Sequence, residues 1–233
     1  MTVPRWRTLT GIPMTLAKVV EDQGKPRLAP YPDWQSQTVG DCSCLQYVQS
    51  MEVDPNTGLM YVIDVGRIGI LGPDDVTPRN LCPAKIVVYD LNTNSRVASY
   101  DLPADVVSRD NNFINDLVLD YVDGAVRYAY ITDVTESRLH VFDFLTKTAW
   151  NVEHRSMRPE VEASVIPING VNYTFSAGLD GIAMSADFRY VYYCPLGGVN
   201  LYQIPTNSLR QGKADQVKNL GRKVSQSDGL AYG

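Results

Sequence analysis

The sequence predicts an all-β protein, and three observations support this class. Windows with apolar residues at positions i, i+3, i+4 and i+7 are scarce, whereas short β-branched and aromatic runs recur between turn residues. The same order of segments appears three times and begins a fourth time. Each repeat holds four strands, as a propeller blade does. We therefore predict a β-propeller with about three complete four-stranded blades and partial strands at both ends.

The first complete blade is predicted over residues 49–102, and residues 1–48 are predicted to hold the outer strands of a preceding blade and a linker. The turn Pro55-Asn56-Thr57-Gly58 separates two apolar runs, which is typical of a hairpin. A long loop then leads to two further runs. The four predicted strands are 49–54, 59–64, 85–91 and 96–102.

Two further blades are predicted over residues 115–154 and 180–220, and residues 228–233 begin another. In each blade the second strand is hydrophobic and the fourth is more polar, as expected for an outer strand. The predicted strands are 115–120, 128–133, 138–144 and 148–153 in one blade, and 180–185, 190–194, 198–204 and 216–220 in the other.

The repeat is loose in length but constant in order. A β-sandwich also has strands at intervals of about 8–12 residues, but it has no reason to repeat a four-strand pattern. The order therefore favours a single partial propeller domain over residues 1–233, in which ligands would meet the innermost strands and the loops at one mouth of the channel. The repeat intervals are 66, 65 and 48 residues, measured between Val53, Leu119, Met184 and Tyr232.

Composition and charge exclude several classes of partner. The 233 residues carry 21 Lys and Arg against 26 Asp and Glu, and a net charge of -5 gives no basic surface for nucleic acid. The most apolar stretch, residues 59–71, is interrupted by Asp64 and Arg67 and is shorter than the roughly 20 residues of a membrane span. Residues 1–6 contain no apolar run of signal-peptide length.

The four cysteines are too few for a disulfide scaffold and lack the paired spacing of a zinc site. Cys194, inside an apolar run, is predicted to be a buried thiol. Cys82 lies in a loop just before a strand, as Cys42 and Cys44 do, so a disulfide from Cys82 to either of them is predicted. Such a bridge would indicate an oxidising compartment.

No motif of a known catalytic class is legible. The sequence contains no G-x-S-x-G, and no glycine-rich phosphate loop follows a strand. The two histidines, His140 and His154, are expected to be ordinary residues of a sheet face and a strand end.

Oxygen-bearing side chains recur at or near the start of each predicted innermost strand: Glu52, Asn115, Asp180 and Asp228. In a propeller these positions would converge at the channel. Calcium prefers such hard oxygen ligands, so it is a candidate cofactor, with Glu52, Asn115 and Asp180 as candidate ligands. Alternatively, these side chains accept hydrogen bonds from the backbone of their own turns.

Short segments in a fixed order run through nearly the whole chain. They include Val3-Pro4-Arg5-Trp6, Gly11-Ile12-Pro13-Met14, Cys82-Pro83-Ala84-Lys85, Ala129-Tyr130-Ile131-Thr132-Asp133 and Ser225-Gln226-Ser227-Asp228-Gly229. Together these segments resemble the yellow and major royal jelly protein family.

This resemblance implies a secreted, six-bladed propeller with about twice the repeat content of this chain. Members of the family carry an export signal before the first matching segment and roughly two further blades after the last. We therefore expect this sequence to be a fragment that lacks the leader and the last blades. The open blade faces of an incomplete ring would be apolar and would promote self-association.

The resemblance also implies a ligand class. In this family the channel is associated with small aromatic amines; some relatives are assigned dopachrome conversion, and others are nutritive secreted proteins. An ammonium ligand would contact carboxylates and aromatic faces. The candidate channel-lining residues are Glu52, Asn115, Asp116, Asp133, Asp180 and Asp228, with Tyr130 and Phe144 as candidate aromatic contacts.

A fainter resemblance, carried by Asn115-Asp116 and Asp180-Gly181-Ile182-Ala183, is to calcium-dependent lactonases of the gluconolactonase type. Their six-bladed propellers hold a metal with Glu, Asn and Asp side chains of inner strands. Three functions therefore stay open: a secreted propeller that binds a small ligand, a metal-dependent hydrolase, and a nutritive or structural secreted protein. Asn172 begins an N-glycosylation triplet and is a candidate acceptor if the chain is exported.

Overall fold

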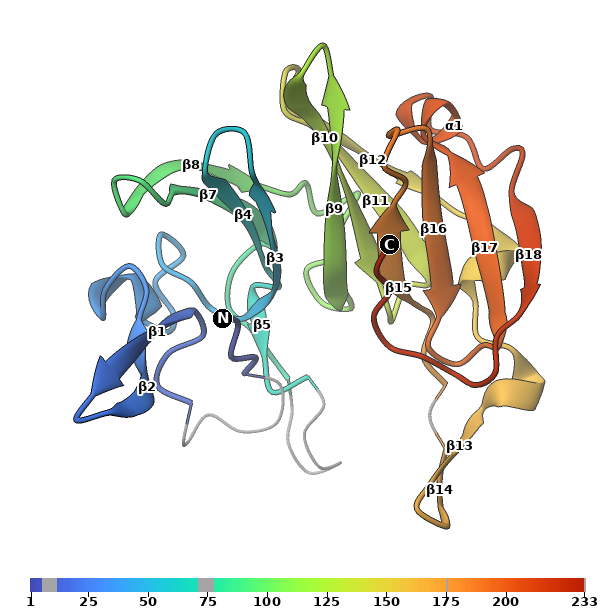
Figure 1. Cartoon of the computed structure of the whole chain (residues 1–233), viewed down its shortest axis with the longest axis horizontal. Helices are drawn as coiled ribbons and strands as arrows, with labels where there is room; N and C mark the ends of the chain where they lie inside the picture. Colours follow the sequence, from blue (N-terminus) through green and yellow to red (C-terminus); the bar gives the residue numbers. More distant parts are fainter. Residues whose placement is uncertain (6–11, 71–77, 175, 233) are drawn as a thin grey trace. The chain divides into compact units, whose positions relative to one another are not determined.

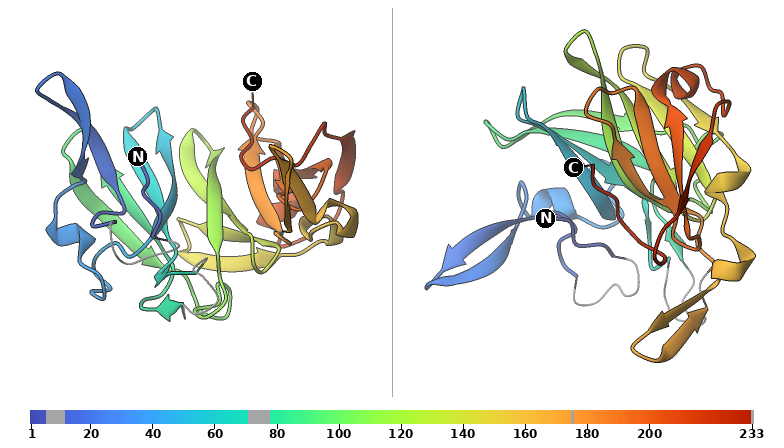
Figure 2. Two further views of the ribbon diagram at one scale, coloured as in Figure 1. Left: turned by 90° about the horizontal axis from the view of Figure 1, so that it is seen from below. Right: turned by 45° about the vertical axis from the view of Figure 1, so that its right-hand side comes forward.

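The computed structural model describes residues 1–5, 12–70, 78–174 and 176–232 (Figure 1, with two further views in Figure 2). Trp6 and Gly11, which carry part of the family resemblance, and Gly233, the last residue of the predicted fourth repeat, lie outside the described residues.

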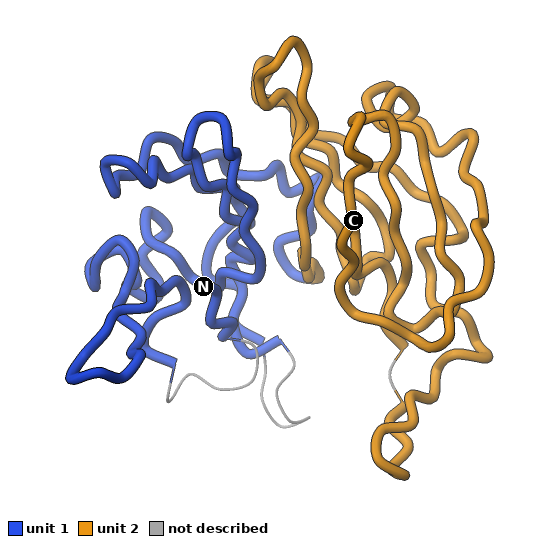
Figure 3. Tube along the Cα trace, viewed as in Figure 1, with its two compact units in different colours: residues 1–110 blue, residues 111–233 orange. Residues whose placement is uncertain are grey.

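The chain forms two compact units, residues 1–110 and 111–233 (Figure 3). Unit 1 contains one four-stranded antiparallel sheet and unit 2 contains two. In each sheet the strands follow one another in sequence order from one edge to the other, which confirms the predicted all-β class and its four-stranded blades. The single partial domain over residues 1–233 stays a prediction. In the described ranges, no helix has the length and apolar character needed to cross a membrane.

The blade of unit 1 has the strand order β3-β4-β7-β8. Its two central strands are almost entirely buried, whereas β8 is mostly exposed, as predicted for an outer strand. A short pair, β5 and β6, lies within the long loop between β4 and β7. The bounds are β3 (Val48–Asp54), β4 (Leu59–Asp64), β5 (Arg67–Ile68), β6 (Arg79–Asn80), β7 (Lys85–Asp90) and β8 (Ser95–Asp101).

The N-terminal part of unit 1 is a hairpin of β1 (Ala17–Asp22) and β2 (Lys25–Pro30), followed by the 3-10 turn η1 (Gln35–Gln37). The buried guanidinium of Arg5 holds the start of the chain to this unit. Its Nη2 donates to the Pro13 carbonyl oxygen (2.8 Å), and its Nη1 donates to the Gln46 carbonyl oxygen (2.9 Å).

The two blades of unit 2 have the orders β9-β10-β11-β12 and β15-β16-β17-β18. The innermost strands β9 and β15 lie in contact with each other. The bounds are β9 (Ile114–Val122), β10 (Ala125–Asp133), β11 (Arg138–Asp143), β12 (Thr148–Val152), β15 (Leu179–Met184), β16 (Tyr190–Pro195), β17 (Asn200–Pro205) and β18 (Lys218–Arg222).

Connections in unit 2 add features that the sequence did not predict. A short helix α1 (Thr206–Arg210) follows β17, and β18 begins two residues later than the strand predicted there. The link between the two blades contains η2 (Arg155–Met157), η3 (Val161–Ala163) and a hairpin of β13 (Val165–Ile168) and β14 (Val171–Thr174). Residues 223–232, which include the start of the predicted fourth repeat, form no strand.

Each unit has its own apolar core. In unit 1 the core joins the blade to the N-terminal hairpin, with Leu16 and Tyr31 packed against Val62 and Tyr89. In unit 2 the core lies between the two blades, where Tyr130 and Val141 of one blade pack with Ile182 and Tyr193 of the other. Neighbouring blades therefore bury each other's faces, as the repeat predicts.

A buried aspartate ends the second strand of two blades. Asp64 accepts hydrogen bonds from the backbone N–H groups of Gln46 (2.8 Å) and Tyr47 (2.9 Å), which lead into β3, and from that of Gly66 (3.0 Å). The ammonium of Lys85 lies 3.7 Å from the same carboxylate. In unit 2, Asp133 ends the second strand of its blade at the position equivalent to Asp64. In unit 1 the aspartate therefore fixes the loop that enters the innermost strand.

The disulfide joins Cys42 to Cys82, with Cα atoms 5.4 Å apart. This settles the predicted pairing of Cys82 in favour of Cys42, and Cys44 stays a buried free thiol. Cys194 is also a buried free thiol, as predicted. The bridge ties the loop before β3 to the loop before β7, so it fixes two adjoining ends of the unit 1 blade.

Replacing Asp64 by alanine is expected to lower the free energy of unfolding by about 3–5 kcal/mol, because it leaves the buried Lys85 ammonium without an opposite charge and three backbone N–H groups without their acceptor. Urea unfolding followed by circular dichroism measures the loss. The matched control is Asp101→Ala, at the exposed end of β8, which should change stability by less than about 0.5 kcal/mol. Equal effects of the two substitutions would contradict the structural role of Asp64.

Candidate functional site

The innermost strands of unit 2 bring two predicted site residues together. Asn115 is the second residue of β9 and Asp180 is the second residue of β15. The Asn115 Nδ2 donates a hydrogen bond to Asp180 Oδ1 at 2.6 Å, and the two residues are only 8% and 5% exposed. The 65-residue separation between them matches the repeat interval, so the contact joins equivalent positions of neighbouring blades.

Asp116 and Asp228 complete a cluster around Asp180, which we call the inner-strand cluster: Asn115, Asp116, Asp180 and Asp228. Both carboxylates act electrostatically on Asp180, and the Asp228 side chain also shares a hydrogen bond with it. Asp116 is half-buried, and its Oδ1 also accepts from the backbone N–H of Leu117 (2.9 Å) within β9.

Gly181 allows the C-terminal segment to reach this cluster. A Cβ atom at Gly181 would lie 2.3 Å from the Asp228 carbonyl oxygen, so only glycine permits this approach. The Tyr192 and Tyr232 rings stack with centroids 5.7 Å apart, which also holds the segment. Figure 1 shows the C-terminal segment running beside β15. The segment therefore lies against the blade although it forms no strand.

Burial, together with repulsion from Asp228 and Asp116, raises the pKa of the Asp180 carboxyl to about 8. The Asn115 amide opposes this shift by donating to the carboxylate. At neutral pH the cluster therefore holds a buried carboxyl group that ionises only with difficulty. A bound cation would favour its ionised form.

The strand registers place Glu52 away from the position of Asn115 and Asp180. Each innermost strand has a bulge beside its second residue, and the register around that bulge makes Gln49 of β3 equivalent to Asn115 and Asp180. Glu52 lies three residues further along β3 and is exposed. Its role as a ligand stays a prediction, but the equivalent residue that sequence inspection missed is Gln49.

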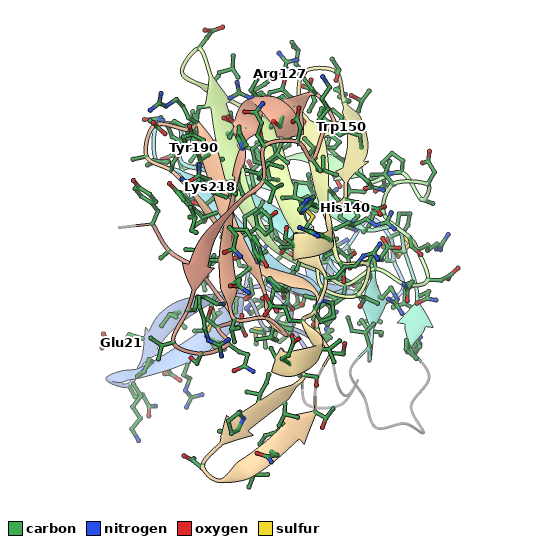
Figure 4. All side chains as sticks on the ribbon, turned by 90° about the vertical axis from the view of Figure 1, so that its right-hand side faces the viewer. Glu21, Arg127, His140, Trp150, Tyr190 and Lys218 are labelled. Carbon is green, nitrogen blue, oxygen red and sulfur yellow. A yellow bond between two sulfur atoms is a disulfide. The ribbon has the colours of Figure 1, made fainter. Side chains whose placement is uncertain are left out.

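Asp133, another predicted channel residue, is engaged by the loop that enters β9. Its carboxylate accepts from the backbone N–H groups of Phe113 (3.2 Å) and Glu136 (2.8 Å), and it lies 3.3 Å from the His140 Nε2. His140 lies on β11, as predicted for a strand residue, and its side chain is buried. Figure 4 shows His140 below Trp150 and Arg127 in the same unit.

The aromatic candidates belong to the packing of unit 2. Tyr130 is buried in the core between the blades, and its hydroxyl donates to Asp120 Oδ2 (2.5 Å). The Phe144 ring packs edge-on against Phe142, with centroids 5.0 Å apart. Asn172 lies exposed on β14, in the hairpin that links the two blades, and its glycosylation stays a prediction.

Comparison with known proteins gives a consistent result. The family model described as "Major royal jelly protein" matches residues 46–232, which include all three blades. Protein yellow of Drosophila yakuba is 33% identical over 223 residues, and Protein yellow of Drosophila melanogaster is 32% identical over the same length. The chain belongs to the major royal jelly protein family.

The match covers 90% of this chain but 39% of the length of each of these two yellow proteins. This family member therefore spans about two fifths of the relatives that it resembles. Among solved structures, a streptogramin B lyase is 11% identical with a TM-score of 0.46, over 90% of this chain and 48% of that one. The β-propeller domain of Myceliophteria thermophila Swd1 is 10% identical with a TM-score of 0.46, over 93% of this chain and 55% of that one.

The stability of this family member should depend on pH through Asp180. Because its pKa in the folded state, about 8, lies above the ordinary value of about 3.9, its contribution to stability is complete below about pH 4 and is lost as the pH rises through 8. The thermal unfolding midpoint of the chain should therefore fall between pH 5 and pH 8.5.

Asp180→Asn, which stays neutral at every pH, should flatten this dependence. The control is Asp187→Asn: Asp187 is exposed, and hydrogen bonds from Ser185 and Arg189 lower its pKa to about 2, so it does not titrate in this range. Differential scanning fluorimetry over a pH series measures both variants. A wild-type slope that persists in Asp180→Asn would contradict the assignment.

Proposed function

We propose that this chain is part of a secreted propeller that binds a small cationic ligand, a biogenic amine or a catechol-derived amine, at the inner-strand cluster. The observation that carries the proposal is the burial of Asp180 beside two further carboxylates. An ammonium group there would supply the positive charge that favours ionised Asp180. Asn115 would hold the carboxylate in place through its hydrogen bond of 2.6 Å.

Secretion is the second part of the proposal. The Cys42–Cys82 disulfide supports it, because disulfides persist in oxidising compartments. Membership of the major royal jelly protein family supports it as well. The chain spans 39% of the yellow proteins, so the ligand of the whole protein is part of the proposal.

A calcium-dependent hydrolase is the competing function. The cluster offers three carboxylates and one amide, which is the oxygen chemistry that calcium prefers. However, Asn115 turns its nitrogen rather than its oxygen toward Asp180, and Glu52, the other predicted ligand, lies at a different strand position. Calcium binding is therefore the less favoured use of these residues, and a nutritive or structural protein would bind neither ligand.

Isothermal titration calorimetry of the chain with tyramine at pH 8.5 and at pH 6.0 tests the proposal. Because the amine favours ionised Asp180, affinity should be at least about 10-fold higher at pH 8.5. Asp180→Asn should weaken binding at pH 8.5 by about 10-fold or more, whereas the exposed control Asp187→Asn should leave it unchanged.

A parallel titration with CaCl2 separates the alternatives. Calcium binding that is lost in Asp180→Asn, without binding of tyramine, would favour the hydrolase. Binding of neither ligand at millimolar concentration would favour a nutritive or structural protein and would contradict the proposed ligand.

A further inference from the structure

Three side chains of unit 2 with metal-binding chemistry gather at the turn between β10 and β11. Asp133 ends β10, Glu136 lies in the turn, and His140 is the third residue of β11. One ligand atom of each lies within 4.8 Å of the others. We propose that these residues form a binding site for a divalent transition-metal ion such as zinc, distinct from the inner-strand cluster.

The distance between Asp133 and His140 suits a shared ion. The His140 Nε2 lies 3.3 Å from Asp133 Oδ2. Two ligand atoms at zinc-binding distances of about 2.0–2.1 Å and a tetrahedral angle are separated by about 3.3 Å. The pair is therefore already spaced as two ligands of one tetrahedral ion.

The hydrogen bonds around the imidazole favour its role as a ligand. The His140 Nδ1 lies 2.7 Å from Asn151 Oδ1, and when Nδ1 donates to that oxygen the lone pair of Nε2 faces Asp133. Two lone pairs then face each other, which an ion between them would relieve. A metal-bound histidine commonly donates its second ring N–H to an oxygen in this way.

The other two candidate ligands differ: backbone donors hold Asp133 in place, whereas one oxygen of Glu136 lacks a hydrogen-bond donor among the described residues. The Phe113 backbone N–H is shared by both oxygens of the Asp133 carboxylate (3.2 Å each), and the Glu136 backbone N–H donates to Oδ1 (2.8 Å). These donors fix the carboxylate with Oδ2 also facing the His140 Nε2. Glu136 Oε2 is buried and accepts no hydrogen bond among the described residues, although the Arg138 Nε lies 3.9 Å away. An ion at the site would supply the missing partner.

The charges and the location also fit a divalent ion. Two carboxylates and a neutral imidazole balance a charge of +2, and this mixed oxygen and nitrogen set suits zinc better than calcium. The Glu136 side chain is 11% exposed, so the turn gives the ion a path from solvent. Arg138 turns its Nη2 toward Glu153 (3.4 Å) and can keep that partner when Glu136 binds the ion.

Isothermal titration calorimetry of the metal-free chain with ZnSO4 tests this proposal. We expect one ion per chain with a dissociation constant below about 10 μM, and a visible d–d absorption band when Co2+ replaces zinc. Glu136→Gln keeps the size of the side chain and should weaken binding at least about 10-fold, while His140→Gln should abolish both binding and the Co2+ band.

Two matched controls keep the result interpretable. His154→Gln replaces the other histidine and Glu162→Gln replaces an exposed glutamate, and both should bind zinc as the wild type does. If His140→Gln fails to fold, Glu136→Gln decides the question, because its side chain forms no hydrogen bond at Oε2 that the fold would lose. Absence of binding at 100 μM zinc, or wild-type affinity in Glu136→Gln, would overturn the proposal.

Discussion

A carboxylate buried inside a unit needs hydrogen-bond donors or a cation, and this requirement determines how the ends of the strands are built. Asp64 is satisfied by three backbone N–H groups and by Lys85. Asp120 is satisfied by the bidentate guanidinium of Arg210, at 2.8 Å to both oxygens, and by the Tyr130 hydroxyl. Because removing one partner leaves a buried charge uncompensated, such groups hold the loops and strands in a single arrangement.

Two other buried acids, Asp180 and Asp133, can do chemistry. The groups that act most strongly on the Asp180 carboxylate are the Asn115 amide and the carboxylates of Asp228 and Asp116. None of these three groups is a cation. Asp133 occupies the same strand position as Asp64, but the side chain beside its carboxylate is His140, the third residue of β11, whereas Asp64 has Lys85, the first residue of β7. An imidazole can be a metal ligand whereas an ammonium cannot, so the neighbour of Asp133 makes it part of a candidate metal site and the neighbour of Asp64 does not.

The fold could be predicted from the sequence because the alternation of apolar and turn residues repeats in each blade. Helix α1 could not, since five residues after a proline carry too little periodicity. The contact between Asn115 and Asp180 was predictable from their equivalent places in the repeat. Gln49 was missed because the bulge that shifts the register of β3 leaves no mark in the sequence, and the site around His140 was missed because its ligands come from a strand end, a turn and a strand.

The central claim is that the partners of a buried acid decide whether it is structural or available to a ligand. Carbon-13 NMR titration of the aspartate carboxyl groups, with Asp180→Asn and Asp143→Asn to assign the signals, tests it most directly. Asp180 should titrate near pH 8. Burial raises the pKa of Asp143, but hydrogen bonds from Arg127 and from the backbone of the adjoining turn outweigh it, so this residue should titrate near pH 2. Midpoints for both residues near the ordinary value of about 3.9 would contradict the account.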